Sequence, residues 1–488
     1  MLPTRFSCNS RVTGWLVCLA TLLAFPYQPA EASDIERLRS AAKRGDAVAQ
    51  HELAVMLDTG EGVPENPREA VKWFRRAAKQ GLVVAQCALG TMYAQGRGVS
   101  TNYRRAVKWF RKAAEQGNAE AQRNLGNLYA RGEGVARDPR EALRWIRRAA
   151  EHGDAEAQDR LGILHALGKW VTKDDKQAVK WFHKAAEQGW AKAQGNLALM
   201  YRDGRGVEKS DGEAARWLRK AAEQGEAIAQ GNLGVMYAEG RGVEEDQQEA
   251  VKWFRKAAEQ GSAKAQGNLA LMYYQGKGVE KSDGKAARWF RKAAEQGEAA
   301  AQYNLAVMYS KGEGVPKDIQ TALMWYRKAA EQGDTKALFN LGVMYSNGYG
   351  VPKNNQRAAE WFHRAALQGH LESEVVLAEM YAEGRGVPKD GVIAYAWLSL
   401  RFSRPLGMLD LVRSKFGRKA ISIRSSLKKQ LTAEQRAAAE RLAKDIRYQQ
   451  ATGTDHLAKE AFLYFVLRSN REKPVKDRYR VLPPLIFP

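Results

Sequence analysis

Residues 225–260 read GEAIAQGNLGVMYAEGRGVEEDQQEAVKWFRKAAEQ, and closely similar stretches precede and follow them along the 488-residue chain. The glycine that opens this stretch recurs every 36 residues, and the nine segments that these glycines bound align without a gap. Internal repetition at a fixed period of this length predicts a solenoid. With each glycine as position 1, ten units begin at Gly45, Gly81, Gly117, Gly153, Gly189, Gly225, Gly261, Gly297, Gly333 and Gly369.

The apolar residues of each unit form two helical faces. Positions 5, 9, 12 and 13 have helical spacing, and so do positions 26, 29, 30 and 33. Between them lies G-x-G-V, as in Gly96-Arg97-Gly98-Val99, where glycine takes the positive φ that ends a helix. Each unit is therefore predicted to be a helical hairpin, and the fold class is all-α, an α/α solenoid of ten 36-residue helix-turn-helix repeats with helical caps.

Tryptophan stands at position 29 of every unit, three residues after an alanine at position 26. A large ring beside small residues at this spacing predicts a packed helical interface, so these tryptophans are assigned to the structural core. They are Trp73, Trp109, Trp145, Trp181, Trp217, Trp253, Trp289, Trp325, Trp361 and Trp397.

The N-terminus has the pattern of a secretory signal peptide. Arg5 and Arg11 precede an apolar stretch over residues 15–25, and Ala30-Glu31-Ala32 is a small-x-small cleavage site. The apolar stretch is shorter than the ~20 residues that a membrane-spanning helix needs. We expect cleavage of residues 1–32 and an exported protein, periplasmic or secreted.

A solenoid needs caps at both ends. Residues 33–44 are similar to the second helix of a missing unit and form the predicted N-terminal cap. After the ten repeats over 45–404, residues 405–470 form the predicted basic C-terminal capping helices, and 471–488 form a proline-containing tail.

Helical patterns in this C-terminal part lie near 408–429 and 455–470. Thr432 and Gln435 have capping-box spacing, which predicts a helix near 433–449.

The charge of the chain is strongly basic, with a formal net charge of +23. Residues 405–488 contain 18 lysines and arginines against 8 acidic residues, a local +10. This end is either a packed cap with a solvated basic rim or a surface that docks on anionic lipid, acidic glycan or an acidic protein. Export makes nucleic acid an unsuitable partner.

Three motifs, A-x-A-Q-x-N-L-G-x-M-Y, G-x-G-V and A-x-x-W-x-x-K-A-A, follow one another in these units, and the chain resembles the Sel1-like repeat family over residues 45 to about 404. The resemblance implies a right-handed superhelix of hairpins, similar to tetratricopeptide arrays, whose first helices line a concave face. It also implies an adaptor role, since members of the family act in bacterial envelope assembly, signalling and host interaction.

The sequence contains no common catalytic or metal-binding motif. None of the seven histidines has metal-ligand spacing, and H-E-x-x-H, C-x-x-C and phosphate-binding loops are absent from the sequence. Ser40-Ala41-Ala42-Lys43 matches the S-x-x-K of penicillin-recognising enzymes, but its S-D-N and K-T-G partners are missing. We therefore predict no enzyme, no catalytic residue, no metal and no cofactor.

Asparagine recurs at position 8 of the units. An amide both donates and accepts hydrogen bonds, so a regular row can bind the backbone of an extended peptide. The same amides can instead satisfy neighbouring helices within the solenoid. The row consists of Asn124, Asn196, Asn232, Asn268, Asn304 and Asn340.

The unit over 153–188 departs most from the pattern. His165 replaces the tyrosine of position 13, and Trp170 replaces the second glycine of the joint. Trp170 is either a surface anchor for a partner or the result of drift in one unit of ten.

The leading hypothesis is thus an exported scaffold, adaptor or regulator that binds protein partners on the concave surface of the solenoid. The alternative is an envelope glycan or anionic-membrane binder that uses the basic C-terminus. A β-lactamase-like serine hydrolase is third.

Overall fold

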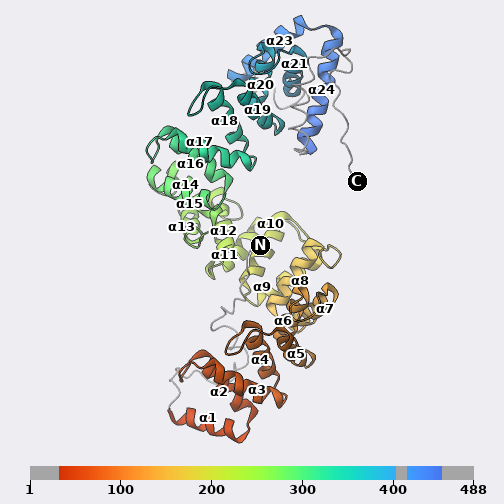
Figure 1. Cartoon of the computed structure of the whole chain (residues 1–488), viewed down its shortest axis with the longest axis vertical. Coiled ribbons are helices and arrows are strands. Elements are labelled where there is room, and N and C mark those ends of the chain that lie inside the picture. The colour runs from red at the N-terminus through yellow and green to blue at the C-terminus, as the bar shows by residue number, and fades with distance from the viewer. Residues whose placement is uncertain (1–31, 403–414, 453–488) are drawn as a thin grey trace. The chain divides into compact units, whose positions relative to one another are not determined.

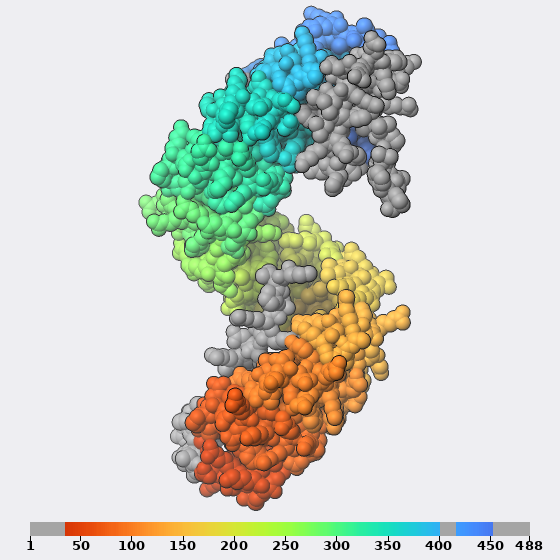
Figure 2. Space-filling view, in the orientation of Figure 1, coloured from red at the N-terminus to blue at the C-terminus, as the bar shows by residue number. Residues whose placement is uncertain are grey.

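The computed structural model describes residues 32–402 and 415–452, and all 23 regular elements within them are helices (Figure 1). This part of the chain forms two compact bodies. The N-terminal body contains residues up to 229 together with 240–244, and the C-terminal body contains 230–239 and the residues from 245 onward (Figure 2).

The helices follow one another as ten hairpins, so the predicted all-α array is confirmed. The first helices of the units are α2 (Ala47–Thr59), α4 (Val83–Gln95), α6 (Ala119–Arg131), α8 (Ala155–Leu167), α10 (Ala191–Asp203), α12 (Ala227–Glu239), α14 (Ala263–Gln275), α16 (Ala299–Lys311), α18 (Thr335–Asn347) and α20 (Leu371–Glu383). The second helices are α3 (Pro67–Lys79), α5 (Tyr103–Glu115), α7 (Pro139–Glu151), α9 (Asp175–Glu187), α11 (Asp211–Glu223), α13 (Gln247–Glu259), α15 (Asp283–Glu295), α17 (Ile319–Glu331), α19 (Asn355–Leu367) and α21 (Gly391–Phe402). Helix α1 (Ala32–Arg44) precedes the hairpins, and α23 (Lys415–Gln430) and α24 (Ala433–Thr452) follow them.

The second helices begin at a short polar side chain at position 22. Asp138 accepts hydrogen bonds from the backbone N–H groups of Arg140 and Glu141 at 2.8 and 3.1 Å, and Asn102 accepts one from Arg105 at 3.0 Å. Each such cap satisfies backbone donors that the helix itself cannot, and contributes about 1 kcal/mol.

The joint between the two helices depends on glycine. Gly96 ends α4 in the left-handed region at φ 72°, and its N–H donates to the carbonyl of Met92. Gly98 also has positive φ, and a Cβ placed on it would lie 2.2 Å from the carbonyl oxygen of Pro67 in the preceding unit. The second glycine therefore gives two hairpins the room to pack.

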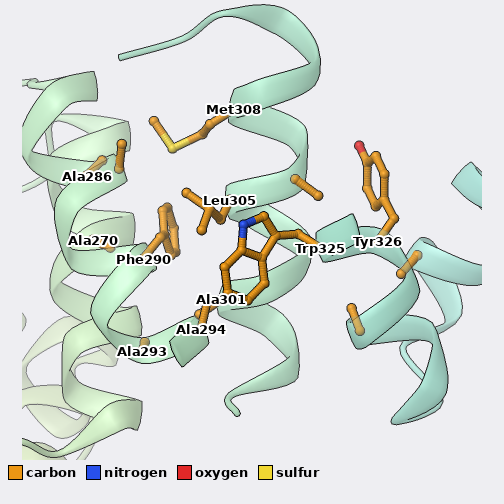
Figure 3. Close-up of a cluster of buried hydrophobic side chains, with 14 of the residues drawn as sticks. Ala270, Ala286, Phe290, Ala293, Ala294, Ala301, Leu305, Met308, Trp325 and Tyr326 are labelled. Carbon is orange, nitrogen blue, oxygen red and sulfur yellow. The ribbon is translucent and has the colours of Figure 1, made fainter. Parts of the chain in front are cut away.

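The core runs between hairpins within each body. The leucine of position 9 is at most 2% exposed in every unit. In the C-terminal body, Leu305 and Met308 of α16 lie beside Phe290 of α15 and Trp325 of α17 (Figure 3). Burial of a leucine of this kind contributes about 1.5–3 kcal/mol, so stacking rather than any single hairpin stabilises the array.

A buried glutamine at position 6 links successive helices. Gln266 is 4% exposed, and its amide donates to the carbonyl oxygen of Ala258 in α13 at 3.0 Å. Gln296, at the end of α15, donates in turn to Oε1 of Gln266 at 2.8 Å. The sequence analysis assigned no role to this series, here called the glutamine ladder. Its buried members are Gln50, Gln86, Gln122, Gln158, Gln194, Gln230, Gln266 and Gln302.

The ladder ends at Gln302, since position 6 of the ninth unit is Leu338, and the C-terminal cap makes a similar contact in the tenth unit. Glu374 stands at position 6 of the last unit and is 1% exposed. Gln450 of α24 donates to the carbonyl oxygen of Ala366 at 2.8 Å and to Oε1 of Glu374 at 3.1 Å. A cap side chain thus binds the carbonyl that a repeat glutamine would bind.

Helix α24 begins at the predicted capping box. The N–H of Thr432 donates to Oε1 of Gln435 at 2.9 Å, and the N–H of Gln435 donates to Oγ1 of Thr432 at 3.1 Å, which confirms that prediction. The helix continues to Thr452, three residues beyond the predicted end.

Several sequence predictions fall outside the described residues. These are the signal peptide up to residue 31, the start of the helix expected from 408, the helix expected over 455–470, and the tail. Within the described ranges, no helix has both the length and the apolar character required to cross a bilayer.

Candidate binding surface on the first helices

Positions 7, 8 and 11 of each first helix share one face, which we call the first-helix face. Position 7 is half-buried in six units and buried in the other four, at His51, Cys87, Asp159 and Val375. Position 11 follows positions 7 and 8 at i+4 and i+3 spacing, so these side chains lie together on the helix surface. Asparagine at position 8 is half-buried in all six units where it occurs. The face is therefore neither core nor fully solvated surface.

Four of the six asparagines have partners within the protein. The Asn196 amide donates to Oδ1 of Asp159 at 2.8 Å, and that of Asn304 donates to the carbonyl oxygen of Ala300 at 2.9 Å. Asn124 accepts from Nη1 of Arg123 at 3.3 Å.

The fourth, Asn340, contacts two tyrosines, Tyr303 and Tyr326. Asn196 and Asn340 thus bond to neighbouring helices, as the structural alternative for the amide row expects, whereas Asn124 and Asn304 bond within their own helices.

Asn232 and Asn268 differ, because neither side chain makes a hydrogen bond with any residue that the structure describes. Each follows a glycine at position 7. A Cβ on Gly231 would come no closer than 4.0 Å to Ala265, and one on Gly267 would meet nothing within 4 Å. Glycine within a helix costs up to about 1 kcal/mol relative to alanine. Amide groups and uncovered backbone are therefore both accessible here, in the C-terminal body.

In the N-terminal body the first-helix face carries charge instead. Nε of Arg123 lies 3.1 Å from Oδ2 of Asp154, and its Nη1 lies 3.0 Å from Oε2 of Glu156. Burial lowers the pKa of Arg123, but the two carboxylates outweigh that effect and raise it. The position 7 substitution was visible in the sequence, yet the sequence analysis did not single it out.

The next unit continues this charged cluster with Asp159 and Arg160 at positions 7 and 8. Asp159 is 6% exposed, and burial raises its pKa although Asn196 and the nearby Trp190 favour the charged form. Nη1 of Arg160 donates to Oδ1 of Asn127 on the preceding first helix. Arg160 stands where other units have asparagine.

Aromatic side chains occupy position 7 in units eight and nine. Tyr303 and Phe339 are half-buried, and the Phe339 ring lies 4.9 Å from that of His370. Burial raises the pKa of Tyr326, behind Tyr303, to about 12. Lys336 lies 5.9 Å from the centre of the Tyr303 ring. This part of the first-helix face combines flat rings with amides.

Trp170, the candidate surface anchor, is half-buried rather than free-standing. Its φ of 66° makes it the only residue other than glycine with positive φ in the described ranges. It packs against a cluster that includes Ile146 and Leu164, and Lys169 lies 5.7 Å from its ring. The strained backbone is stabilised by this packing.

The ten position 29 tryptophans lie at the edge of the core. Six are at most 9% exposed, while Trp109, Trp181, Trp289 and Trp361 are half-buried. A lysine or arginine three residues later covers the ring in the first nine units, as Lys256 does for Trp253 at 4.2 Å. Such cation–π contacts extend the core to a basic outer surface.

Ser40 and Lys43, the residues of the hydrolase alternative, are exposed on α1. Within residues 32–402 and 415–452 no group of three or more histidine, cysteine, aspartate or glutamate side chains is arranged to hold a metal ion.

Ten helical hairpins of one repeating pattern define an α-helical repeat protein. The Sel1 repeat family model matches residues 47–82, 83–118, 119–154, 155–190, 191–226, 227–262, 263–298, 299–334, 335–370 and 371–400. The chain belongs to the Sel1 repeat family.

Two solved structures are similar to this chain. A protective antigen of uropathogenic Escherichia coli with an SLR fold is 35% identical, covers 90% of this chain and 98% of its own, and has a TM-score of 0.61. A Sel1 repeat protein from Oxalobacter formigenes is 36% identical, covers 67% of this chain and 99% of its own, and has a TM-score of 0.48. No curated protein matches the chain.

Proposed function

We propose that this protein is an exported scaffold whose first-helix face binds an extended segment of a protein partner. The Sel1 repeat fold is typical of protein-interaction scaffolds. The observation that carries the proposal is the pair Asn232 and Asn268, whose amides have no partner among the described residues and lie beside open glycines. Such amides can donate to and accept from a peptide backbone, which needs both.

A site-specific crosslinking experiment tests the proposal. A photoreactive residue is introduced in place of Asn268, and the control replaces Arg288, which is exposed on the second helix α15. In intact cells we expect a defined protein adduct from position 268 and none from position 288. Equal labelling from both positions, or no adduct from position 268, would contradict the proposal.

A peptide recovered from such an adduct allows a direct affinity measurement. The variant Asn232→Ala/Asn268→Ala should bind this peptide at least about tenfold more weakly, because the peptide backbone loses its hydrogen bonds to two side-chain amides. Asn304→Ala is the matched control, since that amide already bonds to the carbonyl of Ala300. A similar loss in both variants would indicate a structural role for the row.

Export is part of the proposal and rests on the N-terminal sequence alone. Mass spectrometry of the protein from a periplasmic or secreted fraction should give an N-terminus at or near Ser33. A full-length N-terminus in the cytoplasmic fraction would contradict it.

A second candidate function is docking on an anionic glycan or membrane through the C-terminal cap. Helix α23 contains six lysines and arginines and no acidic residue. Arg418, Lys428 and Lys429 are exposed, whereas Lys419 contacts Glu379 at 2.5 Å. Polycationic helices of this kind attract anionic surfaces in a salt-dependent way.

Truncation is unsuitable as a test here, because it removes Gln450 and buried cap residues. The variant Arg418→Gln/Lys428→Gln/Lys429→Gln keeps the cap and should lose binding to vesicles that contain anionic lipid. The control changes three exposed basic residues of the array, Lys72, Lys108 and Lys180. Equal binding by both variants would refute the second candidate.

A further inference from the structure

Arg160 of α8 is a partly buried guanidinium that no carboxylate of the described residues pairs with at ion-pair distance. Its Nη1 donates to Oδ1 of Asn127, and this is its one hydrogen bond within those residues. A guanidinium carries five N–H donors, so Nε and Nη2 have donors to spare. Burying such a group without a charged partner is costly.

The acidic residues of α8 and its N-cap are engaged elsewhere. Glu156 and Asp154 both contact Arg123, at 3.0 and 3.1 Å, and Asp154 also caps α8 by accepting from the N–H of Ala157 at 2.7 Å. Asp159 accepts from the amide of Asn196 at 2.8 Å. None of these three carboxylates lies within ion-pair distance of Arg160.

The electrostatics agree with this geometry. Burial lowers the pKa of Arg160, and the positive charges of Arg131 and Arg123 lower it further, while Glu156 offsets part of the effect. The surroundings therefore disfavour the cation that Arg160 carries. A negative charge placed against the free N–H groups of Arg160 would favour its charged form.

Apolar side chains lie next to Arg160 on the same helix. Ile163 and Leu167 follow it by three and seven residues, so all three lie along one side of α8. Ile163 is 38% exposed and Leu167 is 69% exposed. The surface therefore joins a poorly neutralised cation to two uncovered aliphatic groups.

We propose that Arg160 binds an acidic side chain of the partner, with an apolar side chain of the same segment lying against Ile163 and Leu167. Arg160 lies on the fourth of the ten first helices, with α6 before it and α10 after it, so an extended segment along the first-helix face crosses Arg160 with its middle rather than its end. An aspartate or glutamate side chain is therefore the occupant that fits, rather than a terminal carboxylate. This inference rests on the proposed function.

A displayed library of random peptides, selected on the purified protein, tests the inference. We expect enriched peptides to contain an aspartate or glutamate next to a leucine, isoleucine or phenylalanine. These peptides are then synthesised with amidated C-termini, which leaves the side-chain carboxylate as the carboxyl group under test. Arg160→Gln should weaken their binding at least about tenfold, as expected for the loss of a charge-assisted pair.

Two controls make the result specific. Arg147→Gln removes an exposed arginine of the adjoining second helix α7 and should leave the affinity unchanged. Replacing the acidic residue of the peptide by its amide should lower affinity for the parent protein but not for Arg160→Gln. Circular dichroism must show that both protein variants retain the helical content of the parent.

The outcomes separate this inference from the proposed function. Enriched peptides without an acidic residue, or equal affinities for parent and Arg160→Gln, would overturn the role of Arg160 and leave peptide binding intact. A library that yields no peptide above background would contradict peptide binding on the first-helix face, and the acidic site with it.

Discussion

The side-chain amide of Gln116 donates to Oε1 of Gln86 at 2.8 Å, and so joins two residues that are 30 positions apart. Gln86 is 4% exposed and donates in turn to the carbonyl oxygen of Ala78 at 3.2 Å. Ala78 lies in the last turn of α3, where carbonyl groups have no partner within the helix. One step of the glutamine ladder therefore satisfies a helix end and connects three successive helices.

Gln86→Ala should destabilise the protein by about 1–2 kcal/mol, because the carbonyl of Ala78 loses its side-chain donor and keeps only the backbone N–H of Gly81 at 3.2 Å. Gln116→Ala should cost less than about 1 kcal/mol, since Gln116 is exposed and water can replace it. Urea unfolding followed by circular dichroism gives the two midpoints. Equal midpoints for the two variants would show that the buried hydrogen bond stabilises the protein no more than the exposed one.

Gly98→Ala and Gly81→Ala form a matched pair at positive φ. Both substitutions place a Cβ in the left-handed region, which costs about 1–2 kcal/mol. Only the Cβ at position 98 meets backbone, at 2.2 Å from the carbonyl oxygen of Pro67, whereas position 81 is open. We expect Gly98→Ala to lower the thermal midpoint clearly more than Gly81→Ala, and the reverse order would contradict the packing described for the joint.

Gln450→Ala should loosen the C-terminal cap without unfolding the rest of the array. The substitution removes the donor to Ala366 and to Glu374, both at the last repeat. Stability in repeat arrays is local, so amide exchange should accelerate in α20, α21 and α24 and stay unchanged in α2 to α10. Lys444→Ala, an exposed change on the same helix, is the control. Uniform acceleration along the chain would argue against a local cap.

The stability of the C-terminal body should fall as the pH drops through the range of His363. Burial lowers the pKa of His363 from 6.5 to about 4, and the ring lies edge-on to Trp397 at 5.7 Å. As the pH falls, the unfolded chain therefore binds a proton near pH 6.5, whereas the folded protein binds it only near pH 4. The contribution of neutral His363 to the free energy of unfolding is fully present above pH 6.5 and is lost between about pH 6.5 and 4. His363→Gln should flatten the decline of the thermal midpoint over this range, and an unchanged slope would contradict the assignment.

Local signals in the sequence were sufficient for the hairpins. Each hairpin is defined by residues within a few turns of one another. These are polar caps such as Asp138, the glycines of the joint and the leucine of position 9. The capping box at Thr432 and Gln435 is of the same kind, and its two hydrogen bonds formed as predicted. The start of α24 followed from the same spacing, but its end did not, and near that end Gln450 bonds to Ala366 and Glu374, which are far away in the sequence.

The candidate surface was only partly predictable. The asparagine row could be read from the repeat, but its division into amides with and without partners could not. Asn196 is engaged because Asp159 lies on the neighbouring helix, whereas Asn268 has no such neighbour among the described residues. Trp170 illustrates the same point. The sequence showed that it replaces a glycine, but not that its backbone is strained or that its ring packs against Ile146.

The sequence by itself determined the period, the two helices of each unit and the buried face, because these follow from spacing along one chain segment. Only the tertiary structure decided which polar groups remain available, as with Gln86, satisfied by a residue 30 positions away, and Arg160, because Glu156 pairs with Arg123 instead. The physical reason is that hydrogen bonding and charge neutralisation depend on distances across stacked units, and a repeat pattern does not specify them.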